Sequence, residues 1–153
     1  PIYSLGEFER CIITDWRLQP TERAFDRRNE ELVKLAERHP GACAYLEMIE
    51  PSSKPPPAPL RKHGMEVFRK LGLNLTCVAV VVHGTEMRAA LVRAVLTGMT
   101  FLIPQFQPAR VFKESEAAAK WLRPRLGMDA EFDRRFVGAA EFLRPPQPAA
   151  RTA

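Results

Sequence analysis

The hydrophobic pattern of residues 74–122 alternates between strand-like and helix-like periods. Residues 77–82 are wholly apolar, which is typical of a strand buried on both faces. Helical spacing follows over residues 86–103, a short apolar run falls at 110–112, and residues 116–122 return to helical spacing. The order strand, helix, strand, helix predicts an α/β fold with a mostly parallel sheet and helices packed on it.

The N-terminal part predicts a hairpin, then a helix and a third strand. Ile2–Leu5 and Phe8–Trp16 have strand patterns, and Gly6 between them can adopt the positive φ of a tight turn. Thr21 is the expected N-cap of the helix, and residues 42–49 form the next strand. We therefore expect a mixed sheet that starts with an antiparallel hairpin. The apolar stripe of the helix consists of Phe25, Leu32, Leu35 and Ala36.

A proline-rich segment follows the third strand, with five prolines between residues 51 and 59. Proline lacks the N–H group that a helix interior or a central strand requires, so this segment is expected to be an exposed connection. It is either a stiff linker or a polyproline II segment that docks on a partner. A short helix is expected next, from about Leu60 to Leu71, ending at Gly72.

The helix expected over residues 86–103 carries two apolar stripes instead of one. A helix that lies on a sheet needs a single apolar face, so the second stripe predicts a further covering element or a binding surface. Phe101 and Phe106 add to the apolar excess. The stripe expected to face inward consists of Met87, Ala90, Leu91, Ala94, Val95, Gly98 and Leu102. The second stripe consists of Val92, Leu96, Met99 and Ile103.

The C-terminal part contains one more amphipathic pattern, over residues 128–143. Such a helix is a candidate cover for the second stripe, on its own chain or on a neighbouring copy. We expect an α/β domain over residues 1–123, this helix over 128–143, and a disordered proline-rich tail over 144–153. The apolar positions of the pattern are Phe132, Phe136, Ala139, Ala140 and Leu143.

The formal net charge is +5, which favours acidic partners. The basic residues are scattered, interleaved with Glu, and without stacking aromatic residues among them, so we expect a solvated surface and not a nucleic-acid interface. Cys11, Cys43 and Cys77 have no metal-type spacing and are expected to be buried thiols. No signal peptide or membrane-spanning run is recognised, which favours a soluble, cytoplasmic protein.

The sequence offers little chemistry. His83-Gly84-Thr85 lies where a central strand meets a helix N-terminus, a common place for anions, but a glycine-rich phosphate loop is lacking. His39 and His63 have no partner at ligand spacing, so no metal site is expected. Asp15 and Glu50 are interpreted as charged groups at strand ends. We therefore expect no catalytic residues, no metal and no cofactor.

The order of elements resembles the STAS superfamily, and more narrowly its small bacterial SpoIIAA-like branch. The best marker is the ending Val111-Phe112, then Glu116-Ala117-Ala118, then Trp121-Leu122, and the resemblance covers residues 2–122. It implies a mixed sheet, no catalytic residues, and docking onto other proteins. It also implies a phosphorylated Ser in the loop after a central strand. Ser52 and Ser53 occupy that loop, although neither is followed by the Gly of the family motif.

Two functions follow as hypotheses, with general nucleic-acid binding, which rests on charge alone, as a weaker third. The first is a non-catalytic interaction module that docks on a protein partner or self-associates. Its contact residues would be Val92, Leu96, Met99, Ile103 and Phe106. The second is a carrier of a lipid or another apolar molecule, in which the same helix and residues 101–103 form a gate over a cavity.

Overall fold

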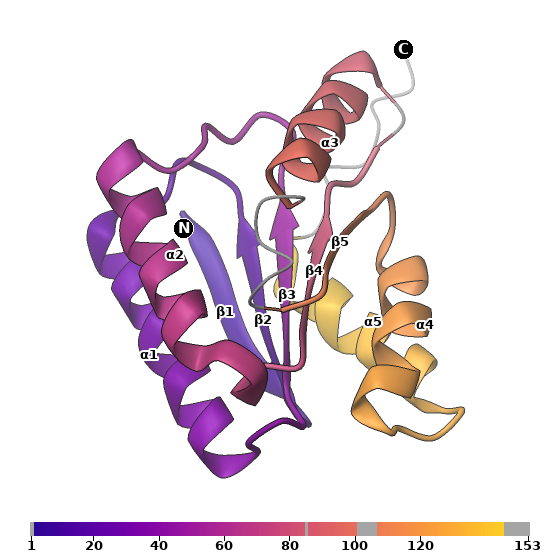
Figure 1. The fold of residues 1–153 in the computed structure, drawn as a ribbon. Coiled ribbons are helices and arrows are strands. Elements are labelled where there is room, and N and C mark those ends of the chain that lie inside the picture. The colour runs from indigo at the N-terminus through magenta and orange to yellow at the C-terminus, as the bar shows by residue number, and fades with distance from the viewer. Residues whose placement is uncertain (1, 85, 101–106, 146–153) are drawn as a thin grey trace.

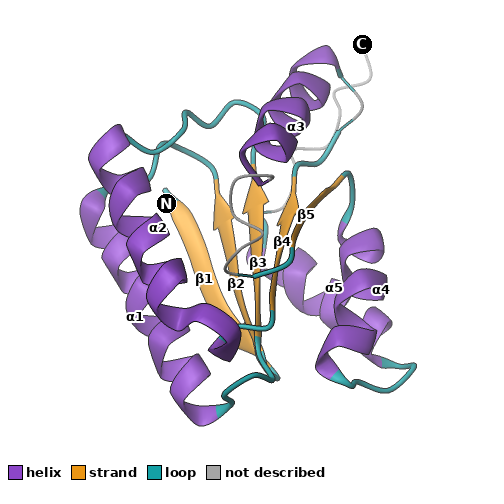
Figure 2. Ribbon diagram, viewed as in Figure 1, coloured by secondary structure: helices purple, strands orange, loops and turns teal. Residues whose placement is uncertain are grey.

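The computed structural model describes residues 2–84, 86–100 and 107–145; at residues 95 and 97–100 it describes the backbone alone. Within these residues lies one sheet in the order β1 (Tyr3–Phe8), β2 (Cys11–Trp16), β3 (Ala44–Ile49), β4 (Cys77–Val81) and β5 (Ala109–Phe112). β1 pairs with β2 antiparallel, and the other pairs are parallel. The predicted mixed, mostly parallel sheet with an N-terminal hairpin is confirmed (Figure 2).

The predicted hairpin turn at Gly6 is wrong. Gly6 lies inside β1, opposite Ile13, and the turn is made by Glu9 and Arg10, with Glu9 at φ +51°. A Cβ atom on Gly6 would lie 3.2 Å from both terminal methyl groups of Leu143, near the C-terminus of the chain. The missing side chain therefore makes room for a helix packed on β1, and it is not needed for a turn.

One face of the sheet is covered by α1 (Glu22–Arg38) and α2 (Ala58–Leu71) (Figure 1). The predicted cap of α1 is confirmed, since the Thr21 hydroxyl accepts a hydrogen bond from the Ala24 amide at 3.3 Å. The predicted stripe of α1 is buried. α2 begins at Ala58, slightly earlier than predicted, and is followed by a 3₁₀ turn, η1 (Gly72–Asn74), that leads into β4.

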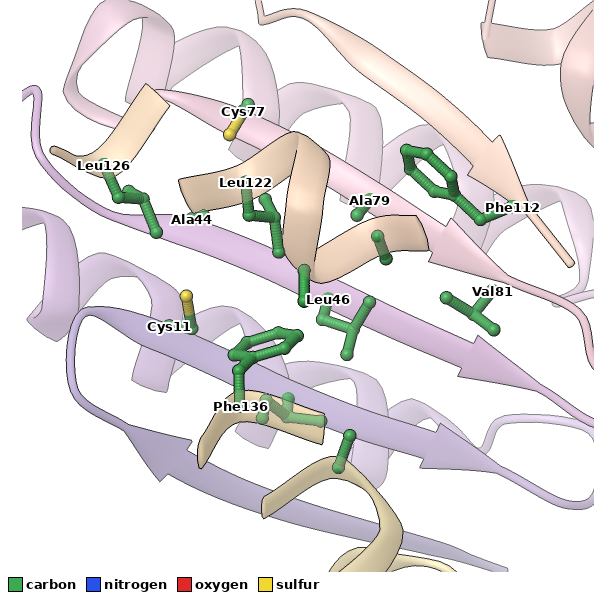
Figure 3. Packing of buried hydrophobic residues seen from close by; sticks show 14 of the residues in the cluster. Cys11, Ala44, Leu46, Cys77, Ala79, Val81, Phe112, Leu122, Leu126 and Phe136 are labelled. Carbon is green, nitrogen blue, oxygen red and sulfur yellow. The ribbon is translucent and has the colours of Figure 1, made fainter. Parts of the chain in front are cut away.

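The other face is covered by α4 (Ser115–Leu126) and α5 (Phe132–Leu143). Figure 3 shows side chains of β2, β3 and β4 pointing toward these helices, with Leu122 and Phe136 packed over them. α5 lies beside α4 and against β1 and β2 of its own chain. It therefore packs on the N-terminal hairpin and not on Val92 and Leu96, the residues of the second stripe whose side chains are described and which lie on the α1–α2 side.

The helix after β4, α3 (Met87–Thr100), lies beyond the carboxyl ends of the central strands, and its orientation differs from the prediction. Met87 and Leu91 were expected to face inward but are 88% and 64% exposed. Val92 and Leu96 instead pack against the core on the α1–α2 side. Leu102, Ile103 and Phe106 lie outside the described residues.

Arg93 explains this orientation. Its guanidinium donates hydrogen bonds to the carbonyl oxygens of Val82 at 2.8 Å and Gly84 at 2.7 Å, just after β4. A helix with two apolar stripes does not reveal from its pattern which stripe faces the sheet. The Arg93 bonds favour the Val92–Leu96 side, because Leu96 is three positions from Arg93 and therefore neighbours it on the helix surface.

The described residues contain no helix that is both long enough and apolar enough to span a bilayer. The three cysteines are free and buried, as predicted. Burial raises the pKa of each thiol. Neutral thiols are poor nucleophiles, so these residues act as small apolar side chains.

Replacing Gly6 by Val should destabilise the protein by about 1–3 kcal/mol, because the new side chain would overlap Leu143. Val favours strands, so without this contact the change would stabilise β1. Gly138→Ala is the matched control: no atom lies within 4 Å of a Cβ at this exposed position in α5, and the change should stabilise by about 0.5–1 kcal/mol. Urea unfolding measures the change in unfolding free energy of each variant relative to the wild type. If Gly6→Val stabilised the protein as Gly138→Ala does, the packing role of Gly6 would be refuted.

Candidate functional site

An apolar pocket of about 510 Å³ lies at the carboxyl ends of β2 and β3, beneath α3. This volume falls within the range typical of small-molecule sites. It also lies where ligands usually bind in parallel α/β sheets, outside the carboxyl ends of the strands. The pocket is lined by Trp16, Pro20, Glu47, Ile49, Ser53, Lys54, Pro55, Pro56, Arg61, Leu91, Val92 and Leu96.

The floor of the pocket is formed by the ends of two paired strands. Trp16 of β2 lies opposite Ile49 of β3 in the ladder. The Trp16 ring is buried, stacks on Tyr3 with centroids 5.0 Å apart, and lies 6.3 Å from the ring of Phe25. Contacts on several sides fix the orientation of the indole, so this wall of the pocket is preformed.

The strands contribute Trp16, Glu47 and Ile49 to the pocket lining, and Glu47 is the charged residue among them. Its carboxylate accepts a hydrogen bond from the Tyr45 hydroxyl at 3.3 Å, and that hydroxyl also lies 2.7 Å from the Thr14 hydroxyl. Burial raises the pKa of Tyr45, so its hydroxyl keeps its proton and remains a donor. Among the described ion pairs none involves Glu47, which leaves a carboxylate in an apolar pocket without a cationic partner from the described residues.

A buried arginine supports this region from the side of α1. Arg28 is 1% exposed, and its guanidinium lies over the rings of Phe25, Tyr45 and Phe68 at 4.2, 5.2 and 5.2 Å. No described carboxylate pairs with Arg28, so the aromatic faces take the place of an ion pair. Gly64 of α2 leaves room for this cluster, because a Cβ there would meet the Phe25 ring at 2.8 Å. The cluster joins α1, α2 and β3 behind the pocket.

The proline-rich segment forms one side of the pocket and is held at three points. Gln19 donates to the carbonyl of Pro55 at 2.9 Å, Arg61 to that of Pro56 at 2.8 Å, and Arg88 to that of Pro51 at 2.9 Å. These donors come from before α1, from α2 and from α3. The segment is therefore a fixed wall of the pocket and more than a connection.

The roof of the pocket is α3, which contributes Leu91, Val92 and Leu96. Two of the predicted partner-binding residues, Val92 and Leu96, thus line the cavity. Ile103 and Phe106 lie outside the described residues, as does the side chain of Met99. The structure brings Val92 and Leu96 together with Trp16 and Ile49 of the sheet.

The two predicted phosphorylation sites lie at the edge of the same pocket. Ser53 lines it, and its hydroxyl donates to the carbonyl of Lys54 at 3.4 Å. Ser52 is exposed. Phosphorylation of either residue stays a prediction.

His83 has a partner that sequence reasoning did not find. Its Nε2 atom lies 3.5 Å from the hydroxyl of Ser115, at the start of α4. Ser115 is fully buried, so no substrate can reach its hydroxyl in this structure. The pair therefore has the distance, but not the access, of a nucleophile and its base.

Asp15 and Glu50 are both paired, at the ends of β2 and β3. Arg17 lies 3.1 Å from Asp15, and Arg144 lies 3.7 Å from Glu50. Burial raises the pKa of Asp15, and the Arg17 cation opposes that effect. In the described part of the chain, no three His, Cys, Asp or Glu residues come close enough to hold a metal ion.

A second depression, of about 880 Å³, runs along α1, between Tyr3 and Glu30. Its walls are mostly charged side chains of α1, such as Arg23 and Arg27, that face solvent. It lacks the buried apolar wall that a small-molecule site normally has. The pocket beneath α3 is therefore the better candidate.

Comparison of the chain with family models, with curated proteins and with solved structures finds no match. The pocket beneath α3 is therefore the main indication of function.

Folding should become less favourable as the pH falls below about 6.5, the ordinary pKa of histidine, because of His83. Burial, with the Arg144 cation adding to it, holds the pKa of His83 below that value. The unfolded chain then binds a proton that the folded chain does not, so acid favours unfolding. The unfolding free energy of the wild type minus that of His83→Gln should decrease from pH 8 to pH 5.5, because only the wild type loses stability through this group. A difference that is constant over this range would contradict the buried, neutral His83.

Proposed function

We propose that this protein binds an apolar small molecule in the pocket beneath α3 and carries it without covalent chemistry. The observation that carries the proposal is the cavity of about 510 Å³, walled by Trp16, Ile49, Val92 and Leu96. We further propose that the chain is a SpoIIAA-like member of the STAS superfamily. The mixed sheet, with helices on both faces, agrees with that assignment.

The walls favour binding because they are already ordered. The floor is part of the sheet, and the proline-rich wall is held by Gln19, Arg61 and Arg88. A ligand then loses little free energy to ordering of the protein. The roof is α3, which among the described helices and strands packs mainly on β5, and its displacement would widen the opening of the pocket to solvent.

The affinity to expect follows from the size of a ligand that fits the pocket. Ligands of drug-like size gain roughly 0.3 kcal/mol for each non-hydrogen atom. A ligand of about 20 such atoms would gain about 6 kcal/mol, which corresponds to a dissociation constant of tens of micromolar. Titrations should therefore extend to several hundred micromolar, roughly ten times that constant.

Glu47 and Tyr45 supply the polar part of the site. The Tyr45 hydroxyl already donates to Glu47, so the carboxylate retains acceptor capacity toward the cavity. A ligand with an apolar body and one hydrogen-bond donor would satisfy that capacity. The donor would fix the orientation of a molecule that apolar contacts alone leave free to rotate.

The interaction-module hypothesis stays a prediction, and the structure places its contact residues differently from one another. Val92 and Leu96 face the protein's own sheet, so they are not free to contact another protein while α3 is closed. The hypothesis then depends on Met99, Ile103 and Phe106. The pocket, by contrast, is lined by residues whose positions the structure describes, and this favours the carrier function.

Ile49→Trp should fill the pocket from its floor and abolish binding of a neutral apolar probe, N-phenyl-1-naphthylamine. The wild type should raise the fluorescence of the probe with a dissociation constant of tens of micromolar. Val92→Trp fills the same space from the roof and should give the same loss, so two chemically similar changes from opposite sides test one cavity.

Leu73→Trp is the matched control, because Leu73 is 85% exposed in η1 and does not line the pocket. It should bind the probe like the wild type. Circular dichroism of each variant checks that the fold is retained. Wild-type protein that fails to bind the probe, or folded variants that bind it undiminished, would rule out the pocket as the site.

A further inference from the structure

α3 projects from the carboxyl edge of the sheet, apart from the four helices that cover its two faces (Figures 1 and 2). Its main packing partner among the helices and strands is β5. Its outward side carries two large apolar residues, Met87 and Leu91, which are 88% and 64% exposed. They are four positions apart, so they lie one above the other on one face of the helix.

This apolar pair is continuous with the pocket. Leu91 is both exposed to solvent and part of the pocket lining. The apolar surface inside the cavity therefore extends past Leu91 onto the outer face of α3. Isolated apolar side chains are common on protein surfaces, but a pair that borders the mouth of an apolar cavity is a more specific feature.

The surroundings of the pair are basic. Lys54 and Arg61 line the pocket and are exposed, and the exposed Arg88 of α3 is bonded to the proline-rich wall beside them. Between Met87 and Thr100 the sequence contains Arg88 and Arg93 and no acidic residue.

Three acidic residues are close to this face, and none reverses its charge. Glu50 precedes Pro51 and is paired with Arg144 at 3.7 Å. Glu86 precedes α3, and its carboxylate is folded back against Gly84. Glu47 is part of β3, on the sheet side of the cavity, and is half-buried. The outer surface around Met87 and Leu91 therefore combines apolar side chains with a positive rim.

We propose that this face docks on the surface of a bilayer that contains anionic lipids, with Met87 and Leu91 inserted at the headgroup level and Lys54, Arg61 and Arg88 on the lipid phosphates. On its outer side α3 presents exposed apolar residues beside basic ones, as helices in the membrane interface do, and its inner apolar side is taken up by the pocket and the core. Basic side chains strengthen such binding when the leaflet is negatively charged. The apolar patch is small, which suits insertion into lipid better than the broad contact of a stable protein complex.

The orientation also serves the proposed carrier function, on which this part of the argument depends. With α3 on the membrane, the mouth of the pocket faces the lipid. An apolar molecule can then pass between bilayer and cavity without crossing water, and displacement of α3 opens the cavity on the membrane side.

The test is co-sedimentation of the full chain with vesicles. The wild type should bind vesicles of phosphatidylcholine mixed with phosphatidylglycerol, should bind vesicles of phosphatidylcholine alone much less, and should be released by high salt, which screens the basic rim. Met87→Asp should weaken binding to the mixed vesicles by about tenfold or more, since it removes one of two inserted side chains and adds a repelled charge.

The matched control is Leu73→Asp. Leu73 is as exposed as Met87, but it lies in η1 before β4, at the opposite edge of the sheet, so its substitution should reduce vesicle binding much less than Met87→Asp. Equal binding by wild type and Met87→Asp, or absence of binding to the mixed vesicles, would overturn the proposal. Self-association that is lost in Met87→Asp, without vesicle binding, would show that the face contacts protein and not lipid.

Failure of the docking proposal can be told apart from failure of the carrier function. Met87 does not line the pocket, so Met87→Asp should bind N-phenyl-1-naphthylamine like the wild type. Probe binding without vesicle binding refutes the docking alone, and vesicle binding without probe binding refutes the carrier function.

Discussion

The architecture depends on the burial of β2, β3 and β4 on both faces. An apolar strand of this kind leaves no side of the sheet free, so two helices must cover each face, and α1–α2 and α4–α5 do so. Buried side chains fill both layers in the described part of the chain. The carboxyl edge is different, because the strands end there and the chain must close the edge with a loop and a fifth helix. The pocket is the space that this closure leaves.

Closure of the edge relies on polar contacts more than on packing. The proline-rich segment cannot form backbone ladders, so Gln19, Arg61 and Arg88 hold its carbonyl groups instead. Arg93 fixes α3 through two carbonyl groups at the end of β4 in the same way. Behind them, the Arg28 cluster gives the side of the pocket a rigid base. The edge is thus held by a few directional bonds, whereas the body of the protein is held by its apolar core.

Local signals in the sequence predicted most of the fold, and contacts between distant residues explain the errors. The Thr21 cap, the apolar run of β4 and the stripe of α1 each involve residues within a few positions of one another, and each was predicted. Gly6 was misread because its neighbour is Leu143, far along the chain. The orientation of α3 was reversed because the deciding contacts are those of Arg93 with the end of β4. The carrier hypothesis predicted a cavity beneath this helix but not its lining by Trp16, Ile49 and the proline-rich segment, which distant contacts bring together, although Glu47, a lone charge in an apolar strand, was a signal for it.

The hydrogen bonds of Gln19, Arg61 and Arg88 to the proline-rich wall affect how equilibrium affinity and residence time of a ligand are related. The wall and floor form the preformed part of the site, since strand pairing and three hydrogen bonds hold them in place without a ligand. The roof influences how fast a ligand exchanges, since α3 packs mainly on β5 in the described part of the chain, whereas each of the other helices packs on at least two elements. Substitutions in α3 outside the lining can therefore alter the residence time of a ligand without altering its equilibrium affinity, whereas substitutions at Leu91, Val92 or Leu96 alter both.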